Sequence, residues 1–313
     1  MKGVIAIINR SGVGSLALEL RDSTSTDLVR DPIELRGYRG NVERLAFSPD
    51  GRRVAAFFGR EPDQTGAIHI YSAAHGGDPL ILQPDTPGSS VASGLEFAPD
   101  GQTLAGTWST TNPDGSNLSS VRIWNAFNGR MIHSLETADV SPRSLAYSPD
   151  GRRLVVGYSD TVRVWNTGNG TLVHTFEPRN SDGFGAWTLS VDYSPDGSRI
   201  AAGGGDGRIR IYEADTFRSQ RGLDGGAEAG VDSMVFINND RLASSTQRAV
   251  RIWILDGYVV IHQFDGEDRS IKPIATDGQR LASILDYDLK VWNAQSGVEI
   301  SRLDDVNPLI AMA

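Results

Sequence analysis

A short turn motif recurs along this chain at regular intervals, and it constrains the fold more than any other feature of the sequence. The motif is an aromatic residue, then Ser or Ala, then Pro-Asp-Gly. It occurs at Phe47–Gly51, Phe97–Gly101, Tyr147–Gly151 and Tyr193–Gly197, with weaker copies around Asp240 and Asp277. The Asp positions are therefore separated by 50, 50, 46, 44 and 37 residues. Such regular recurrence predicts a chain built from repeated structural units.

A second motif follows each turn, and it has the alternation of a β-strand. It reads apolar, basic or His, apolar, aromatic. Its copies are Ile68–Tyr71, Val121–Trp124, Val162–Trp165, Ile209–Tyr212, Val250–Trp253 and Leu289–Trp292. A period of two residues, with β-branched side chains at the apolar positions, is typical of a strand. Pro and Gly at the second and fourth turn positions suit a type I turn. Each unit thus resolves into four short strands: a before the turn, b after it, c with the second motif, and d.

Four-stranded units repeated at about 40–45 residues are typical of β-propellers. The turn motif paired with Val-Arg-Ile-Trp, over essentially the whole chain, resembles the WD-repeat family, and the turn alone also resembles TolB-like propellers. The Asp that follows Trp in WD repeats is replaced by Asn125, Asn166 and Asn293, and the usual Gly-His pair is absent from every repeat. The family's buried His–Asp–Ser–Trp hydrogen-bond network therefore cannot form as a set here.

The blade count follows from the residues left over at both ends. Six sets of strands a, b and c account for most of the chain. Gly3–Ile8 and Ser15–Leu20 look like strands b and c, and Asp31–Leu35 like strand d of the next blade. Val306–Ala311 looks like a lone strand a, and Val298–Leu303 like the remaining strand d. We therefore predict an all-β, seven-bladed β-propeller with four antiparallel strands per blade. Its last blade is closed by strand a from the C-terminus and strands b and c from the N-terminus.

The length of 313 residues is compatible with two domains, but seven units of about 45 residues predict one domain over residues 1–313. The chain has 30 Lys+Arg against 39 Asp+Glu, a formal net charge of -9, which argues against nucleic-acid binding. It has no cysteine, so disulfides and thiolate chemistry are excluded. The apolar run Val4–Ile8 is too short for a signal peptide or a membrane span, so we expect a cytoplasmic protein. We also expect it to be monomeric on its own.

Motifs that carry catalysis are absent from the sequence. There is no Gly-x-Ser-x-Gly elbow, no His-Glu-x-x-His and no phosphate-binding loop. The glycine run Gly203–Gly207 joins strand b to strand c and is expected to form a hairpin turn. We expect no enzymatic activity, no cofactor and no metal site.

Several polar residues have structural interpretations that are preferred over ligand binding. His133, His174 and His262 share one position on the outer strand d, which predicts half-exposed side chains, and His69 is interpreted in the same way. The Arg two residues before each Trp is expected to stack between blades. Asp286 and Asp288 are expected to be solvated carboxylates in a turn.

One loop face is the best candidate for a binding surface. In WD-repeat propellers the d–a and b–c connections share one face; here they vary in length and carry nearly all of the net negative charge, most strongly on blades five to seven. Six aromatic residues fall at the edge of this face and are the candidate partner-binding residues: Tyr38, Phe58, Trp108, Tyr158, Phe184 and Trp187. Trp and Tyr are favoured at binding hot spots. The alternative is that these rings pack beneath the long loops.

These features favour a non-enzymatic scaffold that binds a protein or peptide, with a basic or amphipathic segment as the natural ligand. A fold alone does not define a function. Two alternatives remain from the sequence: a sensor or recognition module of a larger signalling or defence protein, because the chain begins and ends in a strand, and a propeller hydrolase or lyase.

Overall fold

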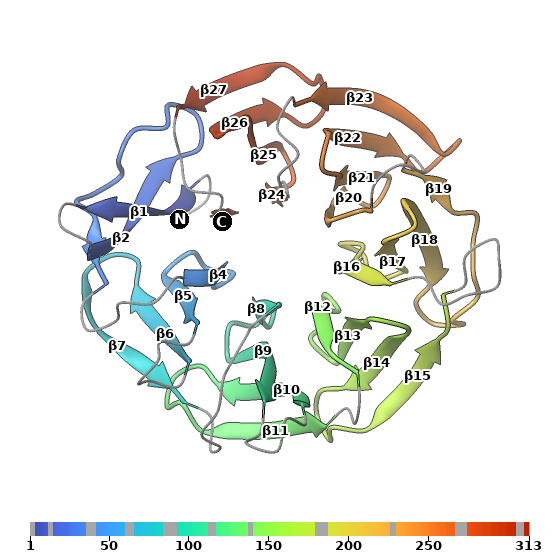
Figure 1. Cartoon of the computed structure of the whole chain (residues 1–313), viewed down its shortest axis with the longest axis horizontal. Helices are drawn as coiled ribbons and strands as arrows, with labels where there is room; N and C mark the ends of the chain where they lie inside the picture. Colours follow the sequence, from blue (N-terminus) through green and yellow to red (C-terminus); the bar gives the residue numbers. More distant parts are fainter. Residues whose placement is uncertain are drawn as a thin grey trace. The chain divides into compact units, whose positions relative to one another are not determined.

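A computed structural model describes residues 4–11, 15–35, 42–59, 66–83, 93–111, 117–136, 140–178, 187–225, 230–266, 274–304 and 310–312. Within these ranges the regular structure is entirely β: 28 strands form seven four-stranded antiparallel sheets (Figure 1). We call these sheets blades 1 to 7, and the strands of each blade a to d. The predicted all-β, seven-bladed architecture is confirmed. No helix in the described part of the chain is long and apolar enough to cross a membrane.

Contacts divide the chain into two compact units, which are described separately. The first comprises residues 1–22, 27–142 and 309–313, and the second residues 23–26 and 143–308. That both units belong to one domain remains a prediction from the repeat.

The first unit holds blades 1, 2 and 7. Blade 1 consists of β4 (Val42–Phe47), β5 (Arg53–Phe58), β6 (Ala67–Ser72) and β7 (Gly76–Leu82). Blade 2 consists of β8 (Leu95–Phe97), β9 (Thr103–Thr111), β10 (Asn117–Asn125) and β11 (Met131–Glu136). Blade 7 consists of β28 (Ile310–Met312), β1 (Val4–Ser11), β2 (Ser15–Asp22) and β3 (Ile33–Glu34).

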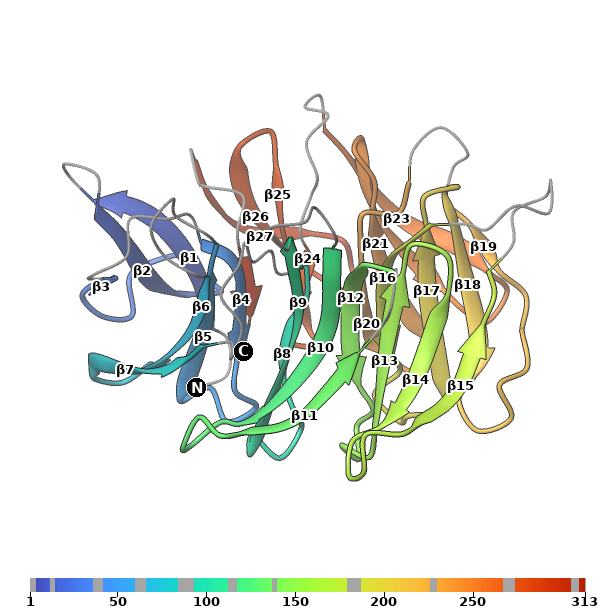
Figure 2. The same ribbon diagram turned by 60° about the horizontal axis from the view of Figure 1, so that its bottom comes forward.

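The second unit holds blades 3 to 6. Blade 3 consists of β12 (Pro142–Tyr147), β13 (Arg153–Tyr158), β14 (Val162–Asn166) and β15 (Leu172–Phe176), which lie side by side in Figure 2. Blade 4 consists of β16 (Thr188–Tyr193), β17 (Arg199–Gly204), β18 (Arg208–Glu213) and β19 (Leu223–Asp224). Blade 5 consists of β20 (Ser233–Asn238), β21 (Arg241–Ser245), β22 (Ala249–Ile254) and β23 (Val259–Asp265). Blade 6 consists of β24 (Ile274–Thr276), β25 (Arg280–Leu285), β26 (Asp288–Asn293) and β27 (Glu299–Leu303).

Blade 7 joins the two ends of the chain. β28 pairs antiparallel with β1, with Ile310 opposite Ile7 and Met312 opposite Ile5, so a C-terminal strand a lies beside N-terminal strands b and c as predicted. The prediction of the d strands is wrong. β3 completes blade 7 and β27 completes blade 6, because each d strand pairs with the c strand that directly precedes it in the chain.

The Ser-Pro-Asp-Gly turns are held by their own side chains. In blade 1 the Ser48 hydroxyl donates to Asp50 Oδ1 (2.6 Å), which also accepts from the backbone N–H of Arg52 (3.0 Å). Gly51 has a φ of 67°, a left-handed conformation that costs glycine little. The Ser48 hydrogen bond, followed by that from Arg52, lowers the pKa of Asp50. The same Ser–Asp hydrogen bond occurs in blades 3 and 4, so this sequence forms one turn wherever it is repeated.

In several blades, the arginine at the start of strand b forms a hydrogen bond with the next blade along the chain. In blade 3, Arg153 Nη1 donates to the carbonyl oxygen of Ala214 in blade 4 (2.7 Å), and its guanidinium lies over the Phe217 ring. The equivalent donations run from Arg53 to Ala126, from Arg199 to Asn239 and from Arg241 to Ala294. These bonds, together with the buried strands between them, position the connecting loops on a rigid support.

The first strands of neighbouring blades in the second unit are also hydrogen-bonded. The bonds run from Val191 N to Ser144 Oγ (3.1 Å), from Phe236 N to Asp192 Oδ2 (2.6 Å) and from Ile274 N to Ser233 Oγ (3.4 Å). Asp192 also accepts from the N–H of Tyr193 (2.8 Å). Loss of solvent around the carboxylate raises the pKa of Asp192 to about 7, although these two hydrogen bonds lower it.

Replacing Asp192 by Asn is expected to remove a pH dependence of stability. The folded pKa lies above that of the unfolded chain, so this group's contribution is full below about pH 4 and is lost as the pH rises through about 7. Relative to Asp192→Asn, the wild type should lose up to about 1.4 kcal/mol per pH unit between about pH 5 and 7. Urea unfolding at pH 5, 6, 7 and 8 measures this difference.

The matched control is Asp150→Asn, in a turn of the same unit. The hydrogen bond from Ser148 lowers the pKa of Asp150, so the stability that its carboxylate contributes is lost only in acid, below about pH 4. The difference in free energy of unfolding between Asp150→Asn and the wild type should stay constant from pH 5 to 8. If the difference in free energy of unfolding between Asp192→Asn and the wild type is also constant over this range, the raised pKa of Asp192 is contradicted.

Candidate functional site

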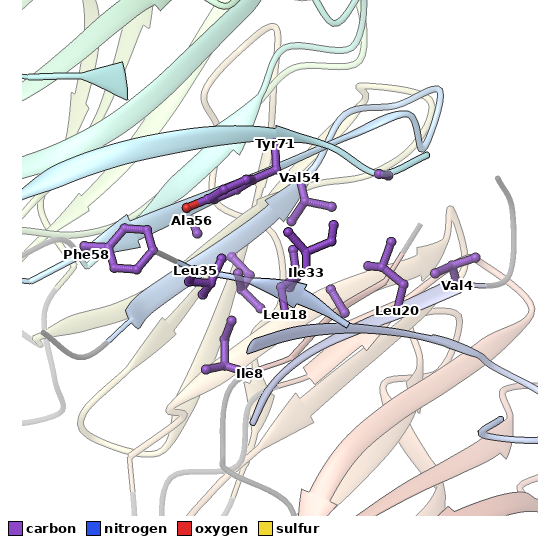
Figure 3. Close-up of a cluster of buried hydrophobic side chains, with 13 residues drawn as sticks. Val4, Ile8, Leu18, Leu20, Ile33, Leu35, Val54, Ala56, Phe58 and Tyr71 are labelled. Atoms are coloured by element: carbon purple, nitrogen blue, oxygen red, sulfur yellow. The ribbon is translucent and has the colours of Figure 1, made fainter. Parts of the chain in front are cut away.

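Three of the six aromatic residues predicted to bind a partner are buried. Phe58 and Tyr158 are 0% exposed and Trp108 is 1% exposed, so the expectation that they anchor a partner at the surface is wrong. Figure 3 shows Phe58 among apolar side chains of blades 1 and 7, including Ala56 and Leu35. The alternative, that these rings pack within the fold, holds for all three.

These rings are buried because strand c covers them. In blade 2 the guanidinium of Arg122 lies over the Trp108 ring (5.5 Å), and in blade 3 that of Arg163 lies over the Tyr158 ring (4.9 Å). Arg122 and Arg163 each stack on the ring at the end of strand b in their own blade, which corrects the expectation of stacking between blades for these two. The aromatic residue and the Arg therefore form one repeated structural pair. Arg251 of blade 5 instead donates to the carbonyl oxygen of Gly225, which follows the outer strand of blade 4.

His69 takes the place of the Arg in blade 1. Its ring lies 4.7 Å from the Phe58 ring, and its Nδ1 is 3.1 Å from the Tyr71 hydroxyl. At 4% exposure it is buried, which corrects the prediction of a half-exposed side chain. Burial lowers the pKa of His69 to about 4, so its imidazole is neutral at pH 7. A neutral, enclosed imidazole packs with the neighbouring rings and is not accessible to a partner.

Trp187 differs from these residues, because its side chain is 64% exposed. It immediately precedes β16, and its carbonyl oxygen accepts a hydrogen bond from Gly205 N in the β17–β18 turn (2.6 Å). The guanidinium of Arg143 lies 6.0 Å from the ring centroid. The backbone that carries this indole is thus fixed by blade 4, while the indole itself faces solvent.

Glycine backbone surrounds the base of Trp187. A Cβ on Gly205 would lie 3.5 Å from the Trp187 Cβ, and one on Gly230 would lie 2.9 Å from Leu189 and 3.1 Å from Gly205. The b–c turn and the d–a connection therefore approach each other more closely than side chains would allow. Gly205 is exposed and Gly230 is half-buried, so small residues lie beside the exposed indole.

The other two predicted residues, Tyr38 and Phe184, lie outside the described residues. The structure adds Tyr287, which the sequence analysis missed and which is 62% exposed. It lies in the two-residue turn between β25 and β26, a b–c connection like that of Gly205. The signal in the sequence was the four-residue segment Leu285–Asp288, whose central positions normally favour Asn and Gly rather than Tyr.

Asp288 is not a solvated turn residue, which corrects another expectation. It is 7% exposed and forms an ion pair with Arg302, which also binds Asp304 (Nε to Oδ1, 2.9 Å). The outer-strand histidines are half-buried, as the sequence predicts, and His174 stacks on Phe217 at 4.3 Å. Among the described residues no group of three or more His, Cys, Asp or Glu side chains is placed to hold a metal ion.

Two family models match this chain. The WD40 domain of anaphase-promoting complex subunit 4 matches residues 117–189, and the WD domain, G-beta repeat, matches residues 170–213. These segments run from β10 of blade 2 to β18 of blade 4. Together with seven four-stranded sheets, the matches support a WD-repeat β-propeller. Propellers of this family generally bind protein partners and act as scaffolds, and they typically lack enzymatic activity.

Proposed function

We propose that this protein is a non-enzymatic scaffold that binds a protein partner on the d–a/b–c loop face of its second unit, with Trp187 as the anchor. The observation that carries the proposal is an exposed indole on a fixed backbone. Trp is among the residues most enriched at binding hot spots, and this one stands on the loop face beside a backbone held by a hydrogen bond.

The rigidity of the site favours binding. The Gly205–Trp187 hydrogen bond and the close approach of Gly230 to Gly205 fix the backbone that carries the indole before a partner arrives. Less conformational entropy is then lost on association, so that more of the contact energy appears as affinity.

Charge favours a basic or amphipathic partner segment. The exposed carboxylate of Asp160 lies in the β13–β14 turn of blade 3. Those of Asp224 and Asp265 end the outer strands of blades 4 and 5, and that of Asp304 directly follows the outer strand of blade 6. A surface with excess negative charge attracts cations and repels anionic partners, which governs association rate and specificity more than affinity. Binding should therefore weaken as the salt concentration rises.

Replacing Trp187 by Ala is expected to reduce partner binding by at least about 30-fold, the loss that corresponds to a hot-spot contribution of about 2 kcal/mol. The measurement is quantitative affinity capture from lysate of the source cells, with captured proteins identified by mass spectrometry. The fold should be retained, because the side chain is mostly in solvent.

The matched control is Phe127→Ala. Phe127 is 67% exposed, lies in the β10–β11 turn, a c–d connection, and packs against Arg53 (4.2 Å). This variant removes an equally exposed ring from a turn of the other class and should leave capture unchanged. Equal capture by wild type and Trp187→Ala, or equal loss in both variants, would contradict the proposed site.

A further inference from the structure

Five residues other than glycine adopt a positive φ in the described part of the chain. They are Thr26 (63°), Phe217 (58°), Tyr258 (57°), Asp286 (56°) and Tyr287 (68°). A side chain in this left-handed region costs about 1 kcal/mol or more relative to glycine, so such a conformation persists only where other contacts maintain it. For three of these residues the maintaining contacts lie within the protein.

Phe217 illustrates how the cost is offset. It occupies a c–d turn in which other blades have glycine, such as Gly129 and Gly170. Its ring stacks on His174 (4.3 Å, interplanar angle 3°) and lies under the guanidinium of Arg153. The aromatic side chain thus gains packing that a glycine would lack.

Tyr258 and Thr26 are maintained in the same way. The guanidinium of Arg221 lies over the Tyr258 ring (5.2 Å), and this ring packs against the core of blades 4 and 5. Thr26 is 8% exposed, and its hydroxyl lies within hydrogen-bonding distance of the Ser25 and Arg302 carbonyl oxygens.

Among the described residues, Tyr287 lacks ring contacts of the kind that offset the positive φ of Phe217 and Tyr258. Its ring is 62% exposed and takes part in none of the ring–ring or cation–ring contacts among the described residues. With Asp286 it forms the central pair of a two-residue hairpin turn, where both residues need a positive φ and glycine is strongly preferred at the second. The chain therefore carries an unfavourable residue at a position where no described residue makes a ring–ring or cation–ring contact with it.

The charged residues near Tyr287 in the sequence indicate which kind of partner group would bind its ring. Asp286 adjoins Tyr287, and Asp288 and Asp304 hold Arg302 between them. Residues 285–290 and 302–304 together carry three carboxylates against two cations, Lys290 and Arg302, and Arg302 is already bound by two of the carboxylates. A guanidinium or ammonium group placed over a tyrosine ring is attracted by the ring, and a net negative surround adds to that attraction.

We propose that Tyr287 is a second contact on the partner-binding face, where it receives an Arg or Lys side chain of the partner. The inference rests on the proposed scaffold function and specifies the chemistry of the partner at one position. Trp187 supplies the apolar anchor and the Tyr287 turn selects a basic residue.

The first test compares two aromatic-to-glycine substitutions at left-handed positions. Tyr287→Gly should raise the melting temperature, by about 1.5 °C for 1 kcal/mol of relieved strain in a chain of 313 residues, because glycine adopts a positive φ without steric strain. Phe217→Gly should lower it, because the stack with His174 and Arg153 is lost. A lower melting temperature for Tyr287→Gly would show that the ring serves the fold and would overturn the proposal.

The second test detects the cation directly. The protein is labelled with 3-fluorotyrosine, and the Tyr287 resonance is the one that disappears from the ¹⁹F spectrum of Tyr287→Phe. The probe is the peptide acetyl-Gly-Arg-Gly-Arg-Gly-amide, with its glutamate counterpart as control. The resonance should shift saturably with the arginine peptide, less at high salt, and not with the glutamate peptide. No shift, or equal shifts with both peptides, would overturn the proposal.

The experiments can contradict the scaffold function at Trp187 and the cation contact at Tyr287 independently of each other. If Trp187→Ala loses partner capture while the Tyr287 resonance ignores the arginine peptide, the scaffold function stands and the cation contact falls. If the resonance responds while Trp187→Ala retains capture, the site proposed around Trp187 is wrong.

Discussion

Replacing Trp108 by Ala is expected to destabilise the protein by about 3–5 kcal/mol, the usual cost of removing a large aromatic side chain from a core. The indole is 1% exposed, lies 5.1 Å from the Phe57 ring in an edge-to-face arrangement and 6.3 Å from the Trp124 ring, and is covered by Arg122. Its removal leaves a cavity and takes the ring away from beneath a buried guanidinium. Chemical denaturation, followed by far-UV circular dichroism, measures the change.

Trp187→Ala is the internal control for this result. The same substitution at a residue that is 64% exposed should change the free energy of unfolding by no more than about 0.5 kcal/mol. The two tryptophans thus separate stability from binding: Trp108→Ala should unfold more easily, and Trp187→Ala should fold normally and lose its partner. Equal unfolding free energies for the two variants would show that Trp108 is not in the core.

Deleting residues 306–313, which include β28, is expected to lower the melting temperature by roughly 10 °C. β28 pairs with Ile5, Ala6 and Ile7 of β1, and these three residues are 0–1% exposed. Removing the strand exposes the backbone of β1 and uncovers apolar side chains that contribute about 1.5–3 kcal/mol each when fully buried. It also leaves an unpaired strand edge, which favours aggregation. Thermal unfolding with light scattering records both effects.

A synthetic peptide of residues 306–313, added in trans, provides the control for the deletion. It should restore part of the lost melting temperature in a concentration-dependent way, because it binds only the folded state. The reversed sequence of the same peptide should not. An unchanged melting temperature of the truncated protein would show that blade 7 does not depend on its C-terminal strand.

The repeat predicted most of the fold because its signals are local. A Ser-Pro-Asp-Gly segment forms the same hydrogen-bonded turn at Ser48, Ser148 and Ser194, whatever surrounds it. The alternation around each Trp fixes strand c in the same way. The d strands at the chain ends were assigned to the wrong blades, because β3 has only two residues and little pattern of its own, so its pairing with β2 was visible only in space.

The candidate site was predicted less well, because exposure is not a local property. Phe58, Trp108 and Tyr158 share one repeated position, and the sequence could not show that Arg or His of strand c covers each ring. Trp187 lies outside the repeated strand positions, and it is the one candidate among the described residues whose ring the structure leaves in solvent. Tyr287 was overlooked, because an aromatic residue in a short acidic turn has no periodicity to reveal it.

The sequence by itself therefore determined the strands and turns of the repeated blades, since these depend on hydrogen bonds and alternation within a few residues. It predicted the junction of the two chain ends in one sheet only indirectly, from the strands left over at both ends, because that pairing joins residues about 305 positions apart. Only the tertiary structure decided which aromatic rings are available to a partner. The physical reason is that burial depends on neighbouring strands, whose side chains cover Trp108 and leave Trp187 and Tyr287 in solvent.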